Sequence, residues 1–403
     1  MIGSSKIIGA VEIGSSKVAV LVGEILDGDS LNIIGLGESP SQGVKKGEIV
    51  DFKAASEAAH DALSRAEQAS GTSIDEAYLS QSGGHLRGFL NTATVNVSAS
   101  NGVVSESDLL RANQEAKARQ LQDSRVYLHH IHNGYQLDGR PVDHPLGMDG
   151  SKLSLAYWSI HADIQKIKDH IHVVNAFGLK VEEVIVSGLA SSITVTSEDE
   201  RAQGVLVIDF GSGTTDFVLY QHGFVCASGS IPVGGDHVTN DVSLGLRISR
   251  KQAESLKIEF GHCQVSPEDE GEKVWLIGDK MIGDRHLPKA SINQIIEARI
   301  GELLQLIRDE LGECWNPKLA PAGVIITGGA SLLPGLGAAV EEVFEQSAHY
   351  GLAPSWVRED LTAPSYSTVL GLLHYALTGQ TRFQTRTSVR KGGLWNRMAK
   401  IFN

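Results

Sequence analysis

A short pattern occurs twice in this chain, and it constrains the fold more than any other feature of the sequence. In each copy an apolar run carries one acidic residue, a glycine and a small polar turn follow, and a second strand-like run begins. The copies are residues 10–18 (AVEIGSSKV) and 207–215 (VIDFGSGTT). One copy alone would be an ordinary β-hairpin. Two copies about half the chain apart predict a duplicated fold with a site between its halves, and their spacing is too long for a solenoid.

Strand-like and helix-like segments alternate along the chain, which favours an α/β architecture. Apolar, β-branched runs predict strands, and apolar residues recurring every three or four positions predict helices. The expected strands are 7–11, 17–25, 76–82, 181–186, 204–219 with its turn, 225–233 and 323–327, with further strands and loops in 123–160. The expected helices are 53–68, 249–260, 291–311, 336–344 and 367–377, with others beginning near 105, 163 and 188. The charged, glycine-rich stretch 261–284 is expected to be a solvated loop.

The composition of the two repeated turns suits a phosphate ligand. Glycine in a tight turn lets backbone N–H groups approach an anion, and serine and threonine hydroxyls add hydrogen bonds. Lys17 supplies a positive charge for a β- or γ-phosphate. Glu12 and Asp209 precede the turns, where a carboxylate would repel phosphate unless Mg²⁺ and its waters lay between them. The pair of turns therefore predicts a clamp around one triphosphate–metal unit, although either turn alone would more often be a plain hairpin tip.

Two further segments suit the nucleoside part of such a ligand. Residues 324–335 have the pattern of a buried strand, two glycines and a helix start, and small residues there would let a flat adenine lie against the backbone. Glu254 and Lys257 share one face of the 249–260 helix and could hydrogen-bond a ribose or an adenine edge. Considered alone, the first pattern is common, and the second pair would more often be a surface salt bridge.

Seven sequence runs, in order, carry a resemblance to a known family. The succession of first hairpin, second hairpin, lysine-bearing helix and Thr-Gly-Gly loop resembles the superfamily of actin, sugar kinases and chaperone ATPases. Within it, the runs are most similar to the FtsA family of bacterial cell division proteins, and they cover nearly the whole chain. The runs are 12–19 (EIGSSKVA), 188–192 (GLASS), 197–201 (SEDER), 231–235 (IPVGG), 253–257 (AESLK), 327–330 (TGGA) and 366–375 (YSTVLGLLHY).

The resemblance implies an actin-like fold, that is, a duplicated, ribonuclease H-like ATPase fold with two lobes. Members of this family lack one of actin's four subdomains and carry a subdomain inserted in the first lobe. We therefore expect the first-lobe core at 1–86 and 163–203, the inserted subdomain at 87–162, the second-lobe core at 204–227, its small subdomain at 228–317, and the second-lobe core with the return to the first lobe at 318–378. A flexible basic linker at 379–391 and an amphipathic membrane-targeting helix at 392–403 would complete the chain.

The resemblance also implies ATP and Mg²⁺ as ligands between the lobes. By position, the first phosphate loop is Gly14, Ser15, Ser16 and Lys17, and the second is Gly211, Ser212, Gly213, Thr214 and Thr215. Ribose and adenine would be surrounded by Gly235, Glu254, Lys257, Gly328, Gly329 and Ala330, and Mg²⁺ would be held through water by Glu12 and Asp209.

Hydrolysis by actin-like relatives uses a Gln or Glu near the segment that is 187–189 here, and that side chain orients the attacking water. This segment contains no acid or amide, and Glu182 and Glu183 lie earlier, on the predicted strand. We therefore assign no catalytic residue. We expect at most a slow ATPase, in which ATP acts mainly as a conformational ligand for polymerisation.

The C-terminal segment differs in charge from the rest of the chain. The net charge is −13, but residues 381–403 hold six basic residues and no acid, which leaves −19 on the body. One face of a helix would carry Leu394, Trp395, Met398, Ile401 and Phe402, with Arg397 and Lys400 off that face. These features predict a helix lying in the plane of an anionic membrane. A terminal helix packed on the core fits less well, because residues 378–388 are polar, Arg-rich and linker-like.

The family implies a protein that forms filaments with itself and attaches the tubulin-like division protein FtsZ to the cytoplasmic face of the cell membrane at the division site. FtsZ would bind within 228–317, and later division proteins would bind the inserted subdomain. The acidic body argues against nucleic acid as a partner. Two alternatives remain open. An actin-fold component of a pilus or secretion platform would lack the terminal helix, and a sugar kinase would need a catalytic aspartate that the sequence does not identify.

Three minor features of the sequence bear on the cellular compartment, on metal binding and on insertion into a membrane. The three cysteines, Cys226, Cys263 and Cys314, are far apart, which argues for a reducing compartment and against a disulfide framework or a zinc site. His129, His130 and His132 alternate along a predicted strand, which favours a polar strand over a metal site. We expect neither a signal peptide nor a membrane-spanning segment.

Overall fold

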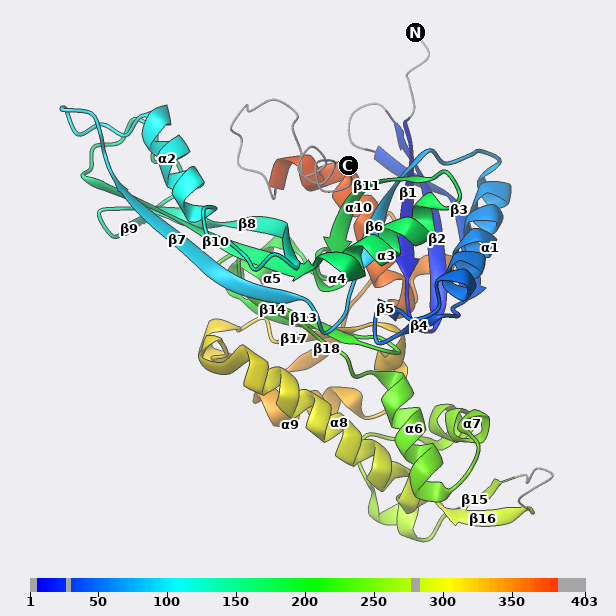
Figure 1. Ribbon diagram of the computed structural model, residues 1–403. Helices are drawn as coiled ribbons and strands as arrows, with labels where there is room; N and C mark the ends of the chain where they lie inside the picture. The colour runs from blue at the N-terminus through cyan, green and yellow to red at the C-terminus, as the bar shows by residue number, and fades with distance from the viewer. Residues whose placement is uncertain (1–5, 27–29, 277–282, 383–403) are drawn as a thin grey trace.

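Two five-stranded sheets with the same topology form the framework of the protein (Figure 1). The computed structural model describes residues 6–26, 30–276 and 283–382. In each sheet three antiparallel strands follow one another along the chain, and two parallel strands extend the sheet beyond the first of the three. The order is β3-β2-β1-β6-β11 in one sheet and β14-β13-β12-β17-β18 in the other. The duplication predicted from the repeats is therefore confirmed.

Each sheet defines one lobe of the molecule. The first lobe is built on β1 (Lys6–Ile13), β2 (Lys17–Leu26), β3 (Ser30–Pro40), β6 (Glu76–Gln81) and β11 (Lys180–Val186). The second lobe is built on β12 (Val205–Phe210), β13 (Thr215–Gln221), β14 (Phe224–Ile231), β17 (Val324–Thr327) and β18 (Ala348–Tyr350). Every residue of β12 and β17 is buried, as expected for central strands of a sheet that is covered on both faces.

Helix α1 (Phe52–Ser70) shows how closely helices pack on the first sheet. Asp51 caps it by accepting a hydrogen bond from the Ala54 N–H, and Gly71 ends it with a left-handed backbone. A Cβ atom on Gly37 of β3 would lie only 1.9 Å from the Ala62 carbonyl oxygen. Small residues on both elements therefore allow the helix to approach the strand this closely.

The other helices of the first lobe cover the sheet and reach the second lobe. α1 packs on β2 and β3 and contacts α3 (Ile164–Asn175), whereas α10 (Ser367–Arg382) packs on β1, β2 and β6. α4 (Ser187–Val195) packs on α10 and contacts strands of both sheets. A short hairpin of β4 (Val44–Lys45) and β5 (Glu48–Ile49) stands beside the end of the first sheet (Figure 1).

A helical region extends from the second sheet and includes elements that the sequence did not indicate (Figure 1). Its members are α6 (Gly235–Leu246), α7 (Arg250–Phe260), α8 (Lys289–Leu311), α9 (Leu336–Phe344) and the hairpin of β15 (Lys273–Leu276) and β16 (Arg285–Pro288). Helix α5 (Glu198–Gln203) lies elsewhere, against β13. Helix α6 was not expected, because its glycines and polar residues have low helix propensity, and packing on α7 and α8 stabilises it.

The prediction of a solvated loop at 261–284 is wrong in part. A 3₁₀ turn at Pro267–Glu270 and strand β15 lie within it. Val274 and Leu276 are buried while Trp275 between them is exposed, and an alternation of four residues is too short to recognise in the sequence. Other 3₁₀ turns lie at Gly312–Cys314, Pro317–Leu319, Gly329–Leu332, Glu359–Leu361 and Pro364–Tyr366.

A third, antiparallel sheet is inserted in the first lobe between β6 and α3. We call it the inserted sheet, and it consists of β7 (Arg87–Asn96), β10 (Lys152–Asp163), β8 (Arg125–Leu137) and β9 (Arg140–Val142) in that spatial order, with α2 (Glu106–Ala116) packed on β7 and β10. Residues from the sheet and α2, including Leu137, Leu153 and Ala112, form a small core separate from the main one. In Figure 1 the sheet extends away from the first lobe and runs beside β14.

The three clustered histidines lie on β8 of the inserted sheet. His129 is buried and its Nε2 accepts a hydrogen bond from the Val186 N–H, while His130 Nδ1 is bonded to the Ser159 hydroxyl. Burial lowers the pKa of His129 to about 4. Across the described ranges, no group of three His, Cys, Asp or Glu side chains is arranged to hold a metal ion.

The C-terminal part of the chain differs from the expectation at one point. Helix α10 continues to Arg382, so residues 379–382 are helical rather than part of a flexible linker. Once packing has formed a helix, each added residue needs no new nucleation, so a polar composition does not end it. The remainder of the predicted linker and the predicted amphipathic helix lie outside the described residues. None of the described helices combines the length and apolar character needed to span a membrane.

Candidate functional site

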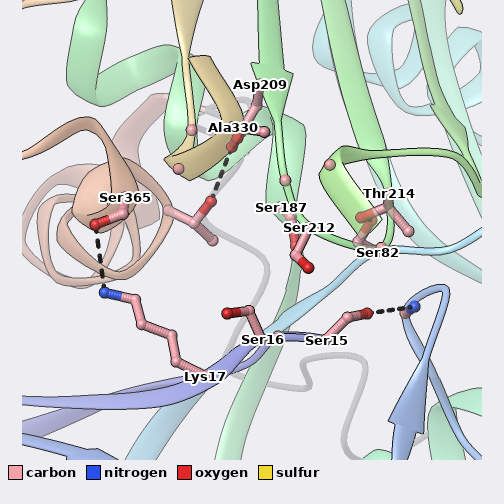
Figure 2. A pocket seen from close by; sticks show the side chains of 18 of the residues that line it. Ser15, Ser16, Lys17, Ser82, Ser187, Asp209, Ser212, Thr214, Ala330 and Ser365 are labelled. Carbon is pink, nitrogen blue, oxygen red and sulfur yellow. Dashed lines mark hydrogen bonds between the residues drawn. The ribbon is translucent and has the colours of Figure 1, made fainter. Parts of the chain in front are cut away.

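The two repeated hairpins face each other across a cleft of about 300 Å³ between the lobes (Figure 2). Predicted site residues that line it are Glu12, Gly14, Ser15, Ser16, Lys17, Asp209, Gly211, Ser212, Gly213, Thr214, Gly235, Glu254, Lys257, Gly328, Gly329 and Ala330. Thr215 is the exception, because it is fully buried and its hydroxyl donates to the Val233 carbonyl at 2.9 Å. The sequence therefore identified residues that the fold brings together from five separate segments.

The two hairpins have the same turn geometry. The Gly14 N–H donates to the Lys17 carbonyl at 3.0 Å, and the Gly211 N–H donates to the Thr214 carbonyl at 2.9 Å. A Cβ atom on either glycine would lie within 3.0 Å of that same carbonyl oxygen. Glycine is needed because the backbone closes on itself immediately beyond it.

The tips of the two hairpins are in direct contact. A Cβ atom on Gly213 would lie 2.1 Å from the Ser15 hydroxyl oxygen and 3.1 Å from the backbone nitrogen of Lys46. The Gly47 N–H in turn donates to the Ser15 hydroxyl at 3.3 Å. The end of the cleft is thus closed by both tips and by the β4–β5 hairpin, with no room for a larger side chain at residue 213.

Three carboxyl groups lie at the floor of the cleft, and the sequence identified two of them. Burial raises the pKa of Glu12 to about 8 and that of Asp216 to about 7, and repulsion from the nearby Asp209 adds to both shifts. Burial also raises the pKa of Asp209. Desolvation is the main cause for all three groups, and repulsion from Asp209 adds to it for Glu12 and Asp216. A bound cation would offset both effects, so the carboxyl groups form a site suited to positive charge.

The three acids differ in their hydrogen-bond partners. Asp209 accepts a hydrogen bond from the Thr368 hydroxyl at 3.0 Å, and Asp216 accepts from the Ser82 hydroxyl at 2.8–2.9 Å. Glu12 Oε2 is shielded from solvent, and no hydrogen-bond donor within the described ranges reaches it. A buried carboxylate oxygen without a donor is costly, and this is the oxygen to which a hydrated cation could bring one.

Asp216 corrects one expectation. The sequence around 187–189 has no acid or amide, but a Cβ atom on Gly188 would lie 3.1 Å from the Asp216 Cβ. An acid therefore does stand beside this segment, and it comes from β13 rather than from the neighbouring sequence. The sequence signal was available, because Asp216 directly follows the second repeat.

Lys17 lines the cleft, but its ammonium group already has partners. Its Nζ donates to Glu38 Oε1 at 2.7 Å and to the Ser365 hydroxyl at 3.4 Å, and it lies 3.7 Å from the centre of the Tyr366 ring. Figure 2 shows the side chain extended along the cleft wall towards Ser365. Contact with a phosphate would require the ammonium group to exchange some of these partners.

The opposite end of the cleft is formed by small residues and one ion pair. Lys257 Nζ donates to Glu254 at 2.8 Å and to the Gly235 carbonyl at 3.2 Å. A Cβ atom on Gly235 would lie 3.1 Å from the Ala330 Cβ, so the two segments form a narrow slot. An adjoining apolar cavity of about 290 Å³ shares these residues and is lined further by Phe210, Val238, Ile258, Ile300, Leu303, Leu332, Leu333 and Pro334.

Several lining residues were not among those predicted for the site. They are Ile13, Gly47, Ser80, Ser82, Ser187, Asp236, Pro364, Ser365 and Thr368. Most of them come from segments without a glycine turn or an acid pattern, so only the fold places them here. The predicted membrane-binding residues 394–402 are not part of the cleft, and they lie outside the described residues.

Family models match two parts of the chain. The model described as "Cell division protein FtsA" matches residues 206–371, and the model described as "SHS2 domain inserted in FTSA" matches residues 83–160. The second range spans the inserted sheet except the last three residues of β10.

Curated relatives match over nearly the full length. The chain is 32% identical to the cell division protein FtsA of Pseudomonas aeruginosa over 94% of its own length and 91% of that protein. It is 31% identical to the FtsA of Escherichia coli K12 over 98% of its own length and 96% of that protein. Both similarities include the first and the second lobe.

Solved structures share the fold at low sequence identity. A chain of the PilM–PilN type IV pilus biogenesis complex matches 92% of this chain and 98% of its own length, with a TM-score of 0.62 and 16% identity. MreB5 of Spiroplasma citri, solved bound to ADP, matches 93% of this chain and 98% of its own length, with a TM-score of 0.52 and 15% identity. These likenesses establish an actin-like fold and nothing about the ligand of this chain.

Proposed function

This chain belongs to the FtsA family of cell division proteins, and from that premise we propose that it binds ATP with Mg²⁺ between its lobes, polymerises, and anchors the FtsZ ring to the cytoplasmic face of the cell membrane. One observation carries the nucleotide part of the proposal. Two hairpins of identical geometry face each other over three desolvated carboxyl groups, one of which has a buried oxygen without a donor. Such a site suits a polyphosphate accompanied by a hard cation.

Mg²⁺ fits the residues that are present if its own waters lie between the ion and the protein. Glu12, Asp209 and Asp216 offer only oxygen atoms, and because no three acids of the described ranges are arranged to coordinate a metal directly, they would hold a hydrated ion. Bound Mg²⁺ would supply charge neutralisation for both the carboxylates and the phosphates. The hairpin turns would then present backbone N–H groups and the hydroxyls of Ser15, Ser16 and Ser212 to the phosphates.

Thermal protection tests the nucleotide assignment. The melting temperature should rise with ATP and Mg²⁺ together, because a ligand that binds only the folded state stabilises it. Lys17→Ala should weaken that rise, whereas Lys180→Ala should not, since Lys180 pairs with Glu76 and Glu182 away from the cleft. If ATP with Mg²⁺ gives no protection and Lys17→Ala has no effect, the assignment is wrong.

Hydrolysis is proposed to be slow, with ATP acting mainly as a conformational ligand. The expected absence of an acid near Gly188 no longer supports this, because Asp216 stands there. What supports it is that Asp216 is already engaged with the Ser82 and Ser230 hydroxyls. Single-turnover ATPase measurements on wild type and Asp216→Asn would decide, and rapid turnover that this substitution abolishes would contradict the proposal.

Membrane anchoring is proposed to reside in residues 392–403, which have an apolar face and basic flanks in sequence. Liposomes containing anionic lipid should sediment the full chain and carry purified FtsZ with it. A chain without residues 392–403 should leave both proteins in the supernatant. Trp395→Glu should weaken sedimentation, and full retention by this variant would refute the role of the tail.

The FtsZ-binding surface is proposed to lie within residues 228–317, which include α6, α7, α8 and the β15–β16 hairpin. Filament formation through the lobes, and binding of later division proteins to the inserted sheet, complete the proposal. The pilus-platform alternative has support from fold alone, at 16% identity. A rapid ATPase that depends on a sugar would instead favour the kinase alternative.

A further inference from the structure

The segment that enters the inserted sheet begins at the floor of the cleft. The Ser82 hydroxyl, one residue after β6, lies 2.8–2.9 Å from both carboxylate oxygens of Asp216. It also lies 2.9 Å from the Thr214 hydroxyl and 3.0 Å from the Ser230 hydroxyl. The next residue continues the contact, because the Gly83 N–H donates to the Ser230 hydroxyl at 3.0 Å. Figure 2 shows Ser82 and Thr214 side by side in the cleft.

The inserted sheet is also hydrogen-bonded along β14 of the second lobe. The Trp158 Nε1–H donates to the Ser228 hydroxyl at 2.8 Å, and the Asn133 amide donates to the Val225 carbonyl at 2.7 Å. Together with the bonds to Ser230, these contacts follow one strand away from the cleft. The inserted sheet is therefore covalently part of the first lobe but non-covalently attached to the second.

The entering segment has little freedom to move independently. A Cβ atom on Gly47 would lie 2.8 Å from the Ser82 carbonyl oxygen, and one on Gly84 would lie 3.0 Å from the Pro232 ring. The segment is packed between the β4–β5 hairpin and the second lobe. Because packed interiors do not deform continuously, a displacement of Ser82 must move its neighbours as well.

We propose that Ser82 couples the state of the cleft to the position of the inserted sheet through Asp216. A serine hydroxyl has one proton, so it can donate fully to only one of its acceptor neighbours at a time. When a ligand in the cleft brings new donors to Asp216, the Ser82 proton is free to turn to Thr214 or Ser230. This exchange would change the bonds that hold the entering segment to β14. Ser82 thus acts as a positioning residue, and the ligand-dependent part of the inference rests on the proposed binding of nucleotide with Mg²⁺.

Hydrogen exchange of the inserted sheet, with and without ATP and Mg²⁺, tests this coupling. In wild type the ligand should change the exchange rates of β7, β8 and β10 amides by about threefold or more, since local opening reports the loss or gain of such contacts. Ser82→Ala should lose this response when it is compared with wild type at ligand concentrations that saturate each protein, with saturation checked by thermal protection. The matched control is Ser228→Ala, which removes another β14 hydroxyl bonded to the inserted sheet, one that pairs with Trp158 and not with Ser82 or Asp216. This control variant should raise the exchange rates both with and without ATP and Mg²⁺, and it should keep the change in rate that the ligand causes.

A second variant makes the test independent of nucleotide. Asp216→Asn changes the acceptor without any ligand, so it should itself alter exchange in the inserted sheet. In a protein that already carries Ser82→Ala, Asp216→Asn should have no further effect, because the hydroxyl that transmits the change is gone. If neither the ligand nor Asp216→Asn alters exchange there, or if Ser82→Ala responds as wild type does, the coupling is refuted. If Asp216→Asn alters exchange while ATP with Mg²⁺ gives wild type no thermal protection, the coupling stands and the proposed nucleotide function fails.

Discussion

The two repeated hairpins share one backbone geometry but differ in how their acids are held. In the second hairpin, Asp209 and the adjacent Asp216 accept hydrogen bonds from threonine and serine hydroxyls. In the first, Glu12 has a buried oxygen with no donor within the described ranges, and Lys17 pairs with Glu38 at the cleft wall. The difference teaches that a duplicated fold need not duplicate its electrostatics. The acids of the second hairpin find their donors within the protein, whereas the buried oxygen of Glu12 would need one from a ligand.

The largest effect should come from breaking the contact between the hairpin tips. Gly213→Ala would place a Cβ atom 2.1 Å from the Ser15 hydroxyl oxygen and 2.6 Å from its Cβ. Overpacking of this kind costs about 1–3 kcal/mol, so nucleotide affinity should fall by about 10- to 100-fold. Titration with a fluorescent ATP analogue would measure it. Adding Ser15→Gly should restore much of the affinity, and failure to do so would show that the tips act separately.

Replacing Glu12 or Asp209 by its amide should change the unfolding free energy by different amounts. Glu12→Gln should raise the unfolding free energy of the ligand-free protein at pH 8 by about 1–2 kcal/mol, because it removes a buried charge that lacks a donor. Asp209→Asn should raise it less, since its carboxylate already accepts from Thr368. Urea unfolding would compare them. Equal gains would contradict the asymmetry between the hairpins.

The first acid should also impose a pH dependence on the ligand-free protein. The pKa of Glu12 is raised to about 8 in the folded state, so the folded state holds a proton that the unfolded state has released. The contribution of Glu12 to stability should therefore fall by about 1.5 kcal/mol as pH rises from 6.5 to 8. Buried histidines with pKa values lowered to about 4, such as His85 and His129, act in the opposite direction at the lower end of this range, so the comparison with Glu12→Gln isolates the glutamate. Unfolding curves at these two pH values should show a smaller difference for Glu12→Gln, and an unchanged difference would assign the effect elsewhere.

The smallest effect should come from the Lys17–Glu38 pair. Both side chains are partly exposed, so separating them should change the unfolding free energy by less than about 1 kcal/mol. A double-mutant cycle with Lys17→Ala and Glu38→Ala would measure the coupling. A larger coupling would mean that Lys17 is fixed in the cleft wall and is not free to exchange towards a phosphate.

Much of the fold and part of the site could be predicted because they depend on local sequence. The glycine turns at 14 and 211, the caps at Asp51 and Asp163, and the apolar strands between them are set by residues within a few positions of one another. Two copies of one pattern were enough to predict the duplication. The residues predicted for the cleft proved to line it, except Thr215, which turns into the core.

Only the tertiary structure decided which groups stand opposite one another. Asp216 lies beside Gly188, and Ser82 lies beside Asp216. Ser82 and Asp216 are more than 100 residues apart in the sequence. Helix α6 forms because its neighbours pack on it, despite its own weak propensity. The sequence by itself determined two glycine turns of one pattern and a basic C-terminal segment at 381–403. The fold determined how the acids are paired, because pairing depends on distance in space and on burial, and neither is a property of local sequence.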